Sequence, residues 1–235
     1  NFLKWFSEAR GYLFESINYS KLDNNNFIDF IPKIGNGLAK QIYNKMFNFN
    51  KLINFVVKNG KYIIYDHESP VHWHKAWSFI PYYFQEGLGE TRSCSLRELR
   101  FSDKNINNVM LCIANSSLFY WFFNITSDCR HLTFETFSRL PVGLDKISNG
   151  IIEKLNDLAT QLMVDYQKNK ELYIRTSKKT GESKFDAYYP MRSKPIIDEI
   201  DKVLALHYGF TDEELDFIIN YDIKYRMGKE LDAGD

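Results

Sequence analysis

Apolar residues recur every three or four positions along several stretches of this chain, which predicts amphipathic helices. The longest stretch runs from 146 to about 169, and its apolar stripe consists of Ile147, Ile151, Leu155, Leu158, Leu162 and Tyr166. A second, aromatic-rich helix is expected over 105–123, with an inward face made of Val109, Leu111, Cys112 and Ile113. Shorter helices are predicted over 35–46 and 134–138. The pattern therefore predicts four helices before residue 170.

Other stretches have the patterns of strands. Residues 61–65 are β-branched and aromatic, and Ser69-Pro70 should end that strand. Residues 95–101 alternate apolar and charged side chains, as a half-exposed strand does. Residues 185–189 are a short third candidate, whereas the polar, basic stretch 175–184 (RTSKKTGESK) is predicted to be a loop. The expected fold class is therefore α+β, a mixed body followed by a helical part.

The segment 193–228 predicts a hairpin of two helices. Ser193 can cap the first helix, Pro195 fits its first turn, and Gly209 supplies a left-handed stop. Thr211 and Glu214 form a capping box for the second helix. The apolar positions of the two helices are Ile196, Ile200, Val203, Leu204 and His207, and then Leu215, Ile218 and Ile219.

Three segments are expected along the chain. Residues 1–19 have no clean period and are interpreted as a linker from an upstream domain, residues 20–145 as a mixed body, and residues 146–235 as a helical C-terminal part. Asp23-Asn-Asn-Asn26 is expected to be a turn. The chain starts with Asn1 instead of methionine, so we expect it to be a piece of a longer protein.

The net charge is zero, but the charges are unevenly distributed. Residues 1–194 hold 26 basic and 19 acidic residues, a net charge of +7, and residues 195–235 hold 4 and 11, a net charge of −7. A mildly basic body could meet phosphates, while an acidic hairpin would pack on a protein neighbour or face solvent. Ordinary scatter of surface charge is the alternative.

Three cysteines, Cys94, Cys112 and Cys129, make no paired framework and no CxxC motif, which favours a reducing, cytoplasmic compartment. No apolar run approaches the ~18 residues of a membrane span. No signal peptide is recognisable, so we expect no membrane partner.

Two stretches resemble a known family. The segment 193–228 is similar to the C-terminus of bacterial restriction-modification adenine-specific DNA methyltransferases. Asn115-Ser-Ser-Leu-Phe-Tyr-Trp-Phe122, followed by Ser127-Asp-Cys-Arg-His131 and Phe137-Ser-Arg-Leu-Pro141, resembles their target-recognition region. The resemblance implies that this chain recognises a DNA sequence, with double-stranded DNA and an upstream methyltransferase domain as partners.

The chemistry of methyl transfer is not encoded in this chain. Adenine methylation uses an Asn/Asp-Pro-Pro-aromatic loop and a glycine-rich turn for S-adenosylmethionine, and the sequence has neither. Gly35-Asn-Gly37 is a weak match to a cofactor loop, because it follows no convincing strand. We therefore expect no cofactor here and S-adenosylmethionine in the upstream domain.

Basic and aromatic residues form the candidate DNA contacts. Lysine neutralises phosphates, and arginine can bind guanine through two hydrogen bonds. The candidates lie in three patches and one corner. The first patch is Trp73, His74 and Lys75, with Trp77 beside them; the second is Arg92, Arg97 and Arg100; the third is Lys178 and Lys179, with Arg175 and Lys184 beside them; and the corner holds Arg130. An exposed charged face without a ligand is the alternative for each.

Three catalytic or metal-binding alternatives are weaker. His72 and His74, close to Asp66, His67 and Glu68, could hold a transition metal, but the spacing is not that of a firm site.

Asp165 with Glu182-Ser-Lys184 resembles the acidic pattern of magnesium-dependent nucleases, although Asp165 is expected on a helix. Cys129 and His131 could form a nucleophile and base, but neighbours on one loop rarely converge, and a corner capped by Asp128 is preferred. A protein-interaction scaffold without DNA contact is the remaining alternative function.

Overall fold

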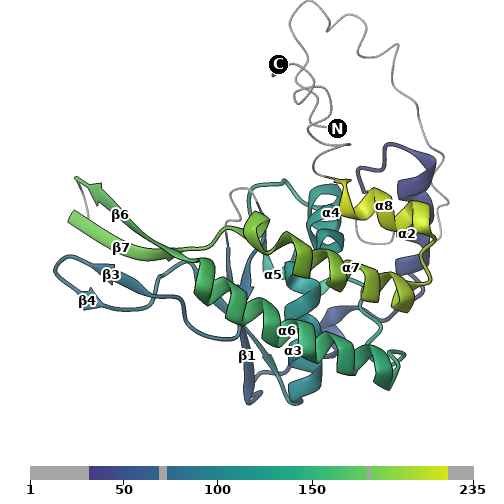
Figure 1. Ribbon diagram of the computed structural model, residues 1–235, viewed down its shortest axis with the longest axis horizontal. Coiled ribbons are helices and arrows are strands. Elements are labelled where there is room, and N and C mark those ends of the chain that lie inside the picture. The colour runs from purple at the N-terminus through teal and green to yellow at the C-terminus, as the bar shows by residue number, and fades with distance from the viewer. Residues whose placement is uncertain (1–31, 69–72, 179–180, 222–235) are drawn as a thin grey trace, which may run out of the picture.

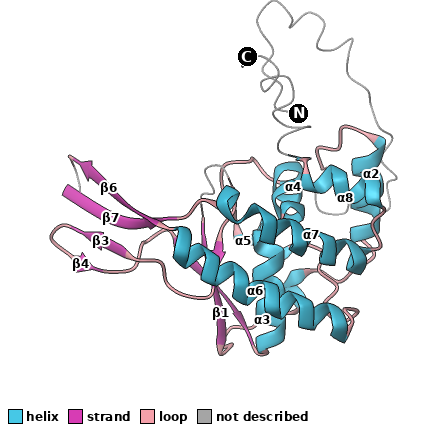
Figure 2. Cartoon of the chain, in the orientation of Figure 1, coloured by secondary structure: helices cyan, strands magenta, loops and turns pink. Residues whose placement is uncertain are grey.

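Seven α-helices and two antiparallel sheets make up residues 32–68, 73–178 and 181–221, the part of the chain described by the computed structural model (Figure 1). The α+β class is therefore confirmed. The helices gather into one body, and the four-stranded sheet projects from its side (Figure 2). Predictions for residues 1–19, 23–26, 69–72 and 222–228 lie outside the described residues.

The aromatic-rich segment forms two helices instead of the predicted one, α3 (Lys104–Asn115) and α4 (Ser117–Thr126). Ser116 between them is extended, and its hydroxyl accepts the N–H of Phe119 at 3.0 Å, which caps α4. The predicted inward residues Val109, Leu111, Cys112 and Ile113 are all buried. Among the described helices none alone is long and apolar enough to cross a membrane. Together α3 and α4 have the length and composition of a membrane span, but the pair is bent by 66°.

The long helix α6 (Asn149–Asn169) packs against α3 and against α7 (Lys194–Tyr208). From its predicted stripe Leu155, Leu162 and Tyr166 are buried, and the other three residues are partly buried against the same core. The core is continuous and includes residues from α2 (Gly37–Met46) through α8 (Asp212–Ile219).

The C-terminal hairpin follows its sequence signals, with one exception. Gly209 ends α7 in the left-handed conformation, with φ +67°, and Thr211 and Glu214 form the capping box of α8. Ser193 does not cap α7, because its hydroxyl instead donates to Asp165 Oδ2 at 2.6 Å. Pro195 lies in the first turn, as predicted.

The first sheet has the strand order β2-β1-β5. Its members are β1 (Tyr62–His67), β2 (Ala76–Trp77) and β5 (Leu96–Phe101), so the two predicted strands are confirmed. In this sheet Ile64 of β1 and Leu99 of β5 are register partners, and both are buried. The short helices α5 (Phe134–Ser138), η3 (Leu52–Asn54) and η4 (Pro190–Ser193) complete the body.

The second sheet has the order β4-β3-β7-β6 and is called the arm here. It consists of β3 (Tyr83–Gln85), β4 (Gly89–Glu90), β6 (Glu171–Ser177) and β7 (Gly181–Ala187). The predicted loop over 175–184 is therefore wrong, because most of it belongs to a hairpin in continuous register. In Figure 1 the arm extends away from the helices, beyond the C-terminal end of α6.

Candidate nucleic-acid interface

The hairpin of β6 and β7 is built by long antiparallel pairing. The register runs without interruption from Glu171 opposite Ala187 to Ser177 opposite Gly181. At the turn Gly181 has φ +66°, and Glu86 Oε2 accepts the N–H of Glu182 at 2.7 Å. Seven residues per strand make the hairpin roughly 23 Å long.

The two faces of the arm differ in chemistry. Register partners on neighbouring strands share a face, so Tyr173, Phe185 and Tyr83 lie together. Arg175, two residues from Tyr173, projects from this same face, which we call the aromatic face. On the other face Lys184 lies over the Phe84 ring, 5.5 Å from its centroid.

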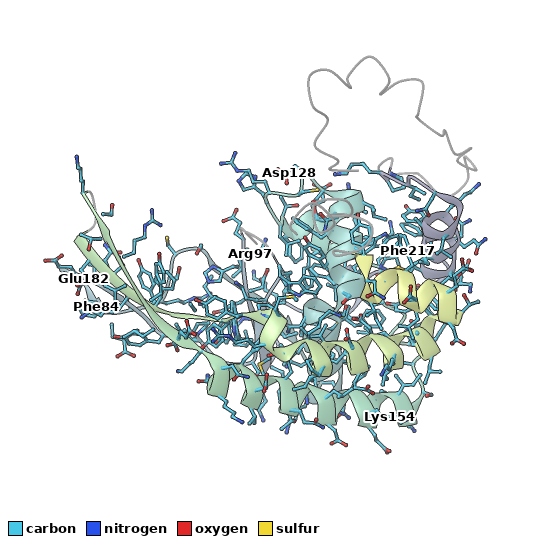
Figure 3. All side chains as sticks on the ribbon, turned by 45° about the horizontal axis from the view of Figure 1, so that its top comes forward. Phe84, Arg97, Asp128, Lys154, Glu182 and Phe217 are labelled. Carbon is cyan, nitrogen blue, oxygen red and sulfur yellow. The ribbon has the colours of Figure 1, made fainter. Side chains whose placement is uncertain are left out.

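Two cations of the arm are available to a ligand. Arg175 and Lys178 are exposed, and within the described part of the chain neither has a hydrogen-bond or acidic partner. Lys184, in contrast, pairs with Glu182 at 3.0 Å. Lys179 lies outside the described residues. Figure 3 places Phe84 and Glu182 on the arm and Lys154 toward the remote end of α6.

The first predicted patch of DNA-contact candidates is largely interior. Trp73 is stacked on Tyr120 with centroids 4.3 Å apart, and Trp77 is 1% exposed. His74 is buried, and its Nδ1 lies 2.5 Å from the carbonyl oxygen of Ala114. Only Lys75 is partly exposed.

Arg97, from the second patch, is partly exposed and belongs to an ion cluster around the buried carboxylate of Asp66. It pairs across the strands with Asp66, and its other amino group donates to the Leu132 carbonyl oxygen. His74 Nε2 lies 3.5 Å from the same carboxylate. Burial acts to raise the pKa of Asp66, but the hydrogen bonds and charges of His74 and Arg97 outweigh it and hold the pKa below 3.8. Arg97 therefore has a structural role.

Arg92 and Arg100 remain at the surface and share one acid. Both bind the carboxylate of Glu98. Burial acts to raise the pKa of Glu98, but the hydrogen bonds and charges of the two guanidinium groups outweigh it and lower that pKa. Arg92 also lies over the Tyr65 ring at 5.5 Å. Two cations around one carboxylate leave a local net charge of +1 beside the first sheet.

The corner around Cys129 is structural, as the preferred interpretation predicts. Asp128 Oδ1 accepts the N–H groups of His131 and Arg130, each at 2.8 Å, and these bonds lower the pKa of Asp128 to about 2. The His131 ring lies 3.1 Å from Asp128, whereas the Cys129 thiol contacts Lys33. The Arg130 side chain is exposed.

The metal and nuclease alternatives gain no geometric support. Within the described ranges no group of three or more histidine, cysteine or acidic residues is placed to hold a metal ion, and His72 lies outside those ranges. Asp165 binds Ser193, and Glu182 binds Lys184 on the arm, so the two carboxylates have separate partners.

A pocket of about 530 Å³ lies where the arm meets the first sheet, and sequence reasoning missed it. Its aromatic lining includes Tyr82, Tyr83 and Tyr188, and Lys75 lines it as well. The available signal was a pair of tyrosine doublets beside prolines, Pro81-Tyr82-Tyr83 and Tyr188-Tyr189-Pro190.

We compared the chain with protein-family models, with curated proteins and with solved structures, and none of the three comparisons gave a match.

Proposed function

We propose that this chain is the target-recognition part of an adenine-N6 DNA methyltransferase of a restriction-modification system, and that it binds duplex DNA through the arm. One observation carries the proposal: a projecting β-hairpin presents two exposed cations, Arg175 and Lys178, that have no acidic partner among the residues that the structure describes. The major groove admits a two-stranded ribbon of this kind.

Each strand of the hairpin supplies a different part of the contact. On β6 all residues from Glu171 to Thr176 are exposed, so this strand can enter a groove without moving a neighbour. In this proposal Arg175 would reach a base edge, and Lys178, at the turn, would neutralise a phosphate. Arg92 and Arg100 would add positive potential beside the first sheet, because the single carboxylate of Glu98 neutralises only one of their two charges.

Methyl transfer is assigned to an upstream domain in this proposal. The chain has no Asn/Asp-Pro-Pro-aromatic loop, so S-adenosylmethionine and the flipped adenine would be held elsewhere. Flipping costs a few kcal/mol, and contacts spread along the flanking duplex offset that cost. The arm would provide such contacts.

The test measures duplex binding by fluorescence anisotropy over a range of salt concentrations, for the parent chain and for a double variant of the arm. Arg175→Ala with Lys178→Ala is expected to weaken binding and to reduce the slope of log affinity against log salt by about 1, because the phosphate contact of Lys178 contributes about 0.9. The matched control is Lys154→Ala with Lys168→Ala, two exposed lysines on α6. Equal slopes for the two double variants would refute the role of the arm.

A protein-interaction scaffold is the second candidate, and one observation favours it. Leu172 and Ile174 are 59% and 53% exposed on the face of the arm opposite Arg175, and β6 is the outermost strand. An exposed apolar edge can pair with another chain. A scaffold of this kind would leave duplex DNA unbound even at low salt, which separates it from the first proposal.

A further inference from the structure

The pocket at the base of the arm combines aromatic walls with a single cation. Its walls come from the first sheet and the arm, with Trp77 of β2, Tyr83 of β3 and Phe185 of β7 among them. The volume of about 530 Å³ is within the range of small-molecule sites. Aromatic walls suit a flat, apolar-faced ligand.

Lys75 is the unusual member of this lining. It is partly buried, burial lowers its pKa, and in the described part of the chain it has no hydrogen-bond or ion-pair partner. Lys75 also affects His67. Burial is the largest cause that lowers the pKa of the His67 ring, and the positive charge of Lys75 is the next. The acid that lines the pocket, Asp186, already accepts from Lys170 at 2.8 Å and from the Tyr188 hydroxyl at 3.3 Å.

The indole N–H groups of Trp73 and Trp77 are inaccessible to solvent, so these two residues contribute ring surface to the pocket and no donor. The hydroxyls of Ser93 and Ser95 lie 3.0 Å apart, and Ser95 also lies 3.0 Å from His67 Nδ1. A planar ring with an acceptor atom would match both the aromatic walls and the Lys75 ammonium, since a buried donor without a partner is costly.

We propose that this pocket binds a single unstacked nucleobase with a keto oxygen on its major-groove edge, guanine (O6) or thymine (O4), with that oxygen facing the Lys75 ammonium. Two further observations suit this ligand. The pocket and the aromatic face of the arm share Tyr83 and Phe185, so a base displaced from a duplex held by Arg175 has a short path to it. Adenine and cytosine carry an amino group at that position, which would instead oppose a donor with a donor.

The idea that the base comes from DNA rests on the proposed function. Binding of mononucleotides tests the pocket independently of that function. Intrinsic tryptophan fluorescence is the readout, because Trp73 and Trp77 line the site. Deoxyguanosine and thymidine monophosphates are expected to change the emission at millimolar concentration and to bind about tenfold more tightly than deoxyadenosine monophosphate, as one charge-assisted hydrogen bond allows.

Three variants separate charge, stacking and chance. Lys75→Met keeps the length of the side chain and is expected to remove the preference for keto bases. Tyr82→Leu removes one aromatic wall and is expected to weaken all nucleotides alike. Lys154→Met, on α6, is the control and is expected to behave as the parent chain.

A second arm of the experiment uses duplexes with one unpaired guanine. The parent chain is expected to prefer them about tenfold over fully paired duplexes, and Lys75→Met to lose this preference while it keeps its affinity for paired DNA. Equal binding of all four mononucleotides, unaffected by Lys75→Met, would overturn the proposal, as would no fluorescence change at all. Failure to bind paired duplex would instead count against the DNA-reading function alone.

Discussion

The cost of replacing Asp201 with asparagine is expected to depend strongly on pH. Asp201 lies on α7, is 2% exposed, and its two carboxylate oxygens accept the N–H groups of Ser117 and Leu118 at 3.1 and 3.2 Å. These donors begin α4, where an anion is favoured. Burial nevertheless dominates and raises the pKa of Asp201 from 3.8 to about 6.

The sign of the effect follows from proton linkage. Between these pKa values the folded chain binds a proton that the unfolded chain has lost, so stability falls as pH rises from about 4 to about 6 and then levels off. One pKa unit corresponds to about 1.36 kcal/mol, so the ionised carboxylate makes the folded chain roughly 3 kcal/mol less stable in the alkaline limit than in the acid limit.

Asparagine cannot ionise, but it retains only one acceptor for the two N–H groups. Leaving one buried N–H unsatisfied costs about 1–3 kcal/mol at any pH. Asp201→Asn is therefore expected to be destabilising near pH 4, whereas near pH 8 relief of the buried charge offsets most or all of that loss. The difference between the two pH values is expected to be roughly 2–3 kcal/mol.

Urea unfolding at the two pH values measures this difference, with the midpoint and slope compared between variant and parent. Asp157→Asn, an exposed position on α6, is the matched control and should change stability by the same small amount at both. If Asp201→Asn cost the same near pH 4 and near pH 8, the raised pKa and the reasoning from burial would both be refuted.

Further predictions concern stability and are measured by the same unfolding assay. Arg97→Met is expected to cost about 3–5 kcal/mol of stability, because it leaves the buried Asp66 carboxylate without its guanidinium partner. Arg100→Met breaks a surface pair with Glu98 and is expected to cost less than about 1 kcal/mol. Equal losses would contradict the structural role of Arg97. Gly60→Ala is expected to cost about 1–3 kcal/mol or more, because its Cβ would lie 2.5 Å from backbone atoms of Phe101. Gly209→Ala is expected to cost about 1–2 kcal/mol at φ +67°, and an unchanged midpoint would contradict the αL stop.

Local signals in the sequence predicted the elements that local chemistry decides. The turn at Gly209, the capping box of Thr211 and Glu214, and the alternating strand β5 all follow from neighbouring residues. The break at Ser116 was missed because apolar residues continue on both sides of it, which hides the change in helix direction.

The arm and the pocket depend on contacts between distant segments, so local patterns could not reveal them. In β6 the residues from 171 to 176 are exposed on both faces, and the strand therefore lacks the apolar–polar alternation of a half-buried one. Trp73 and Arg97 were expected to contact DNA, but Trp73 is buried against Tyr120, and Arg97, although partly exposed, is bound to the buried Asp66. Composition alone does not distinguish a buried aromatic or arginine from an exposed one.

The most direct test of DNA binding by this chain is the affinity of the intact, unmodified protein for duplex DNA across a range of salt concentrations. We predict measurable binding at low salt that weakens linearly in log affinity against log salt, as counterion release requires. Absence of binding at the lowest salt, or affinity that does not change with salt, would contradict the claim that cations of the arm contact the phosphates.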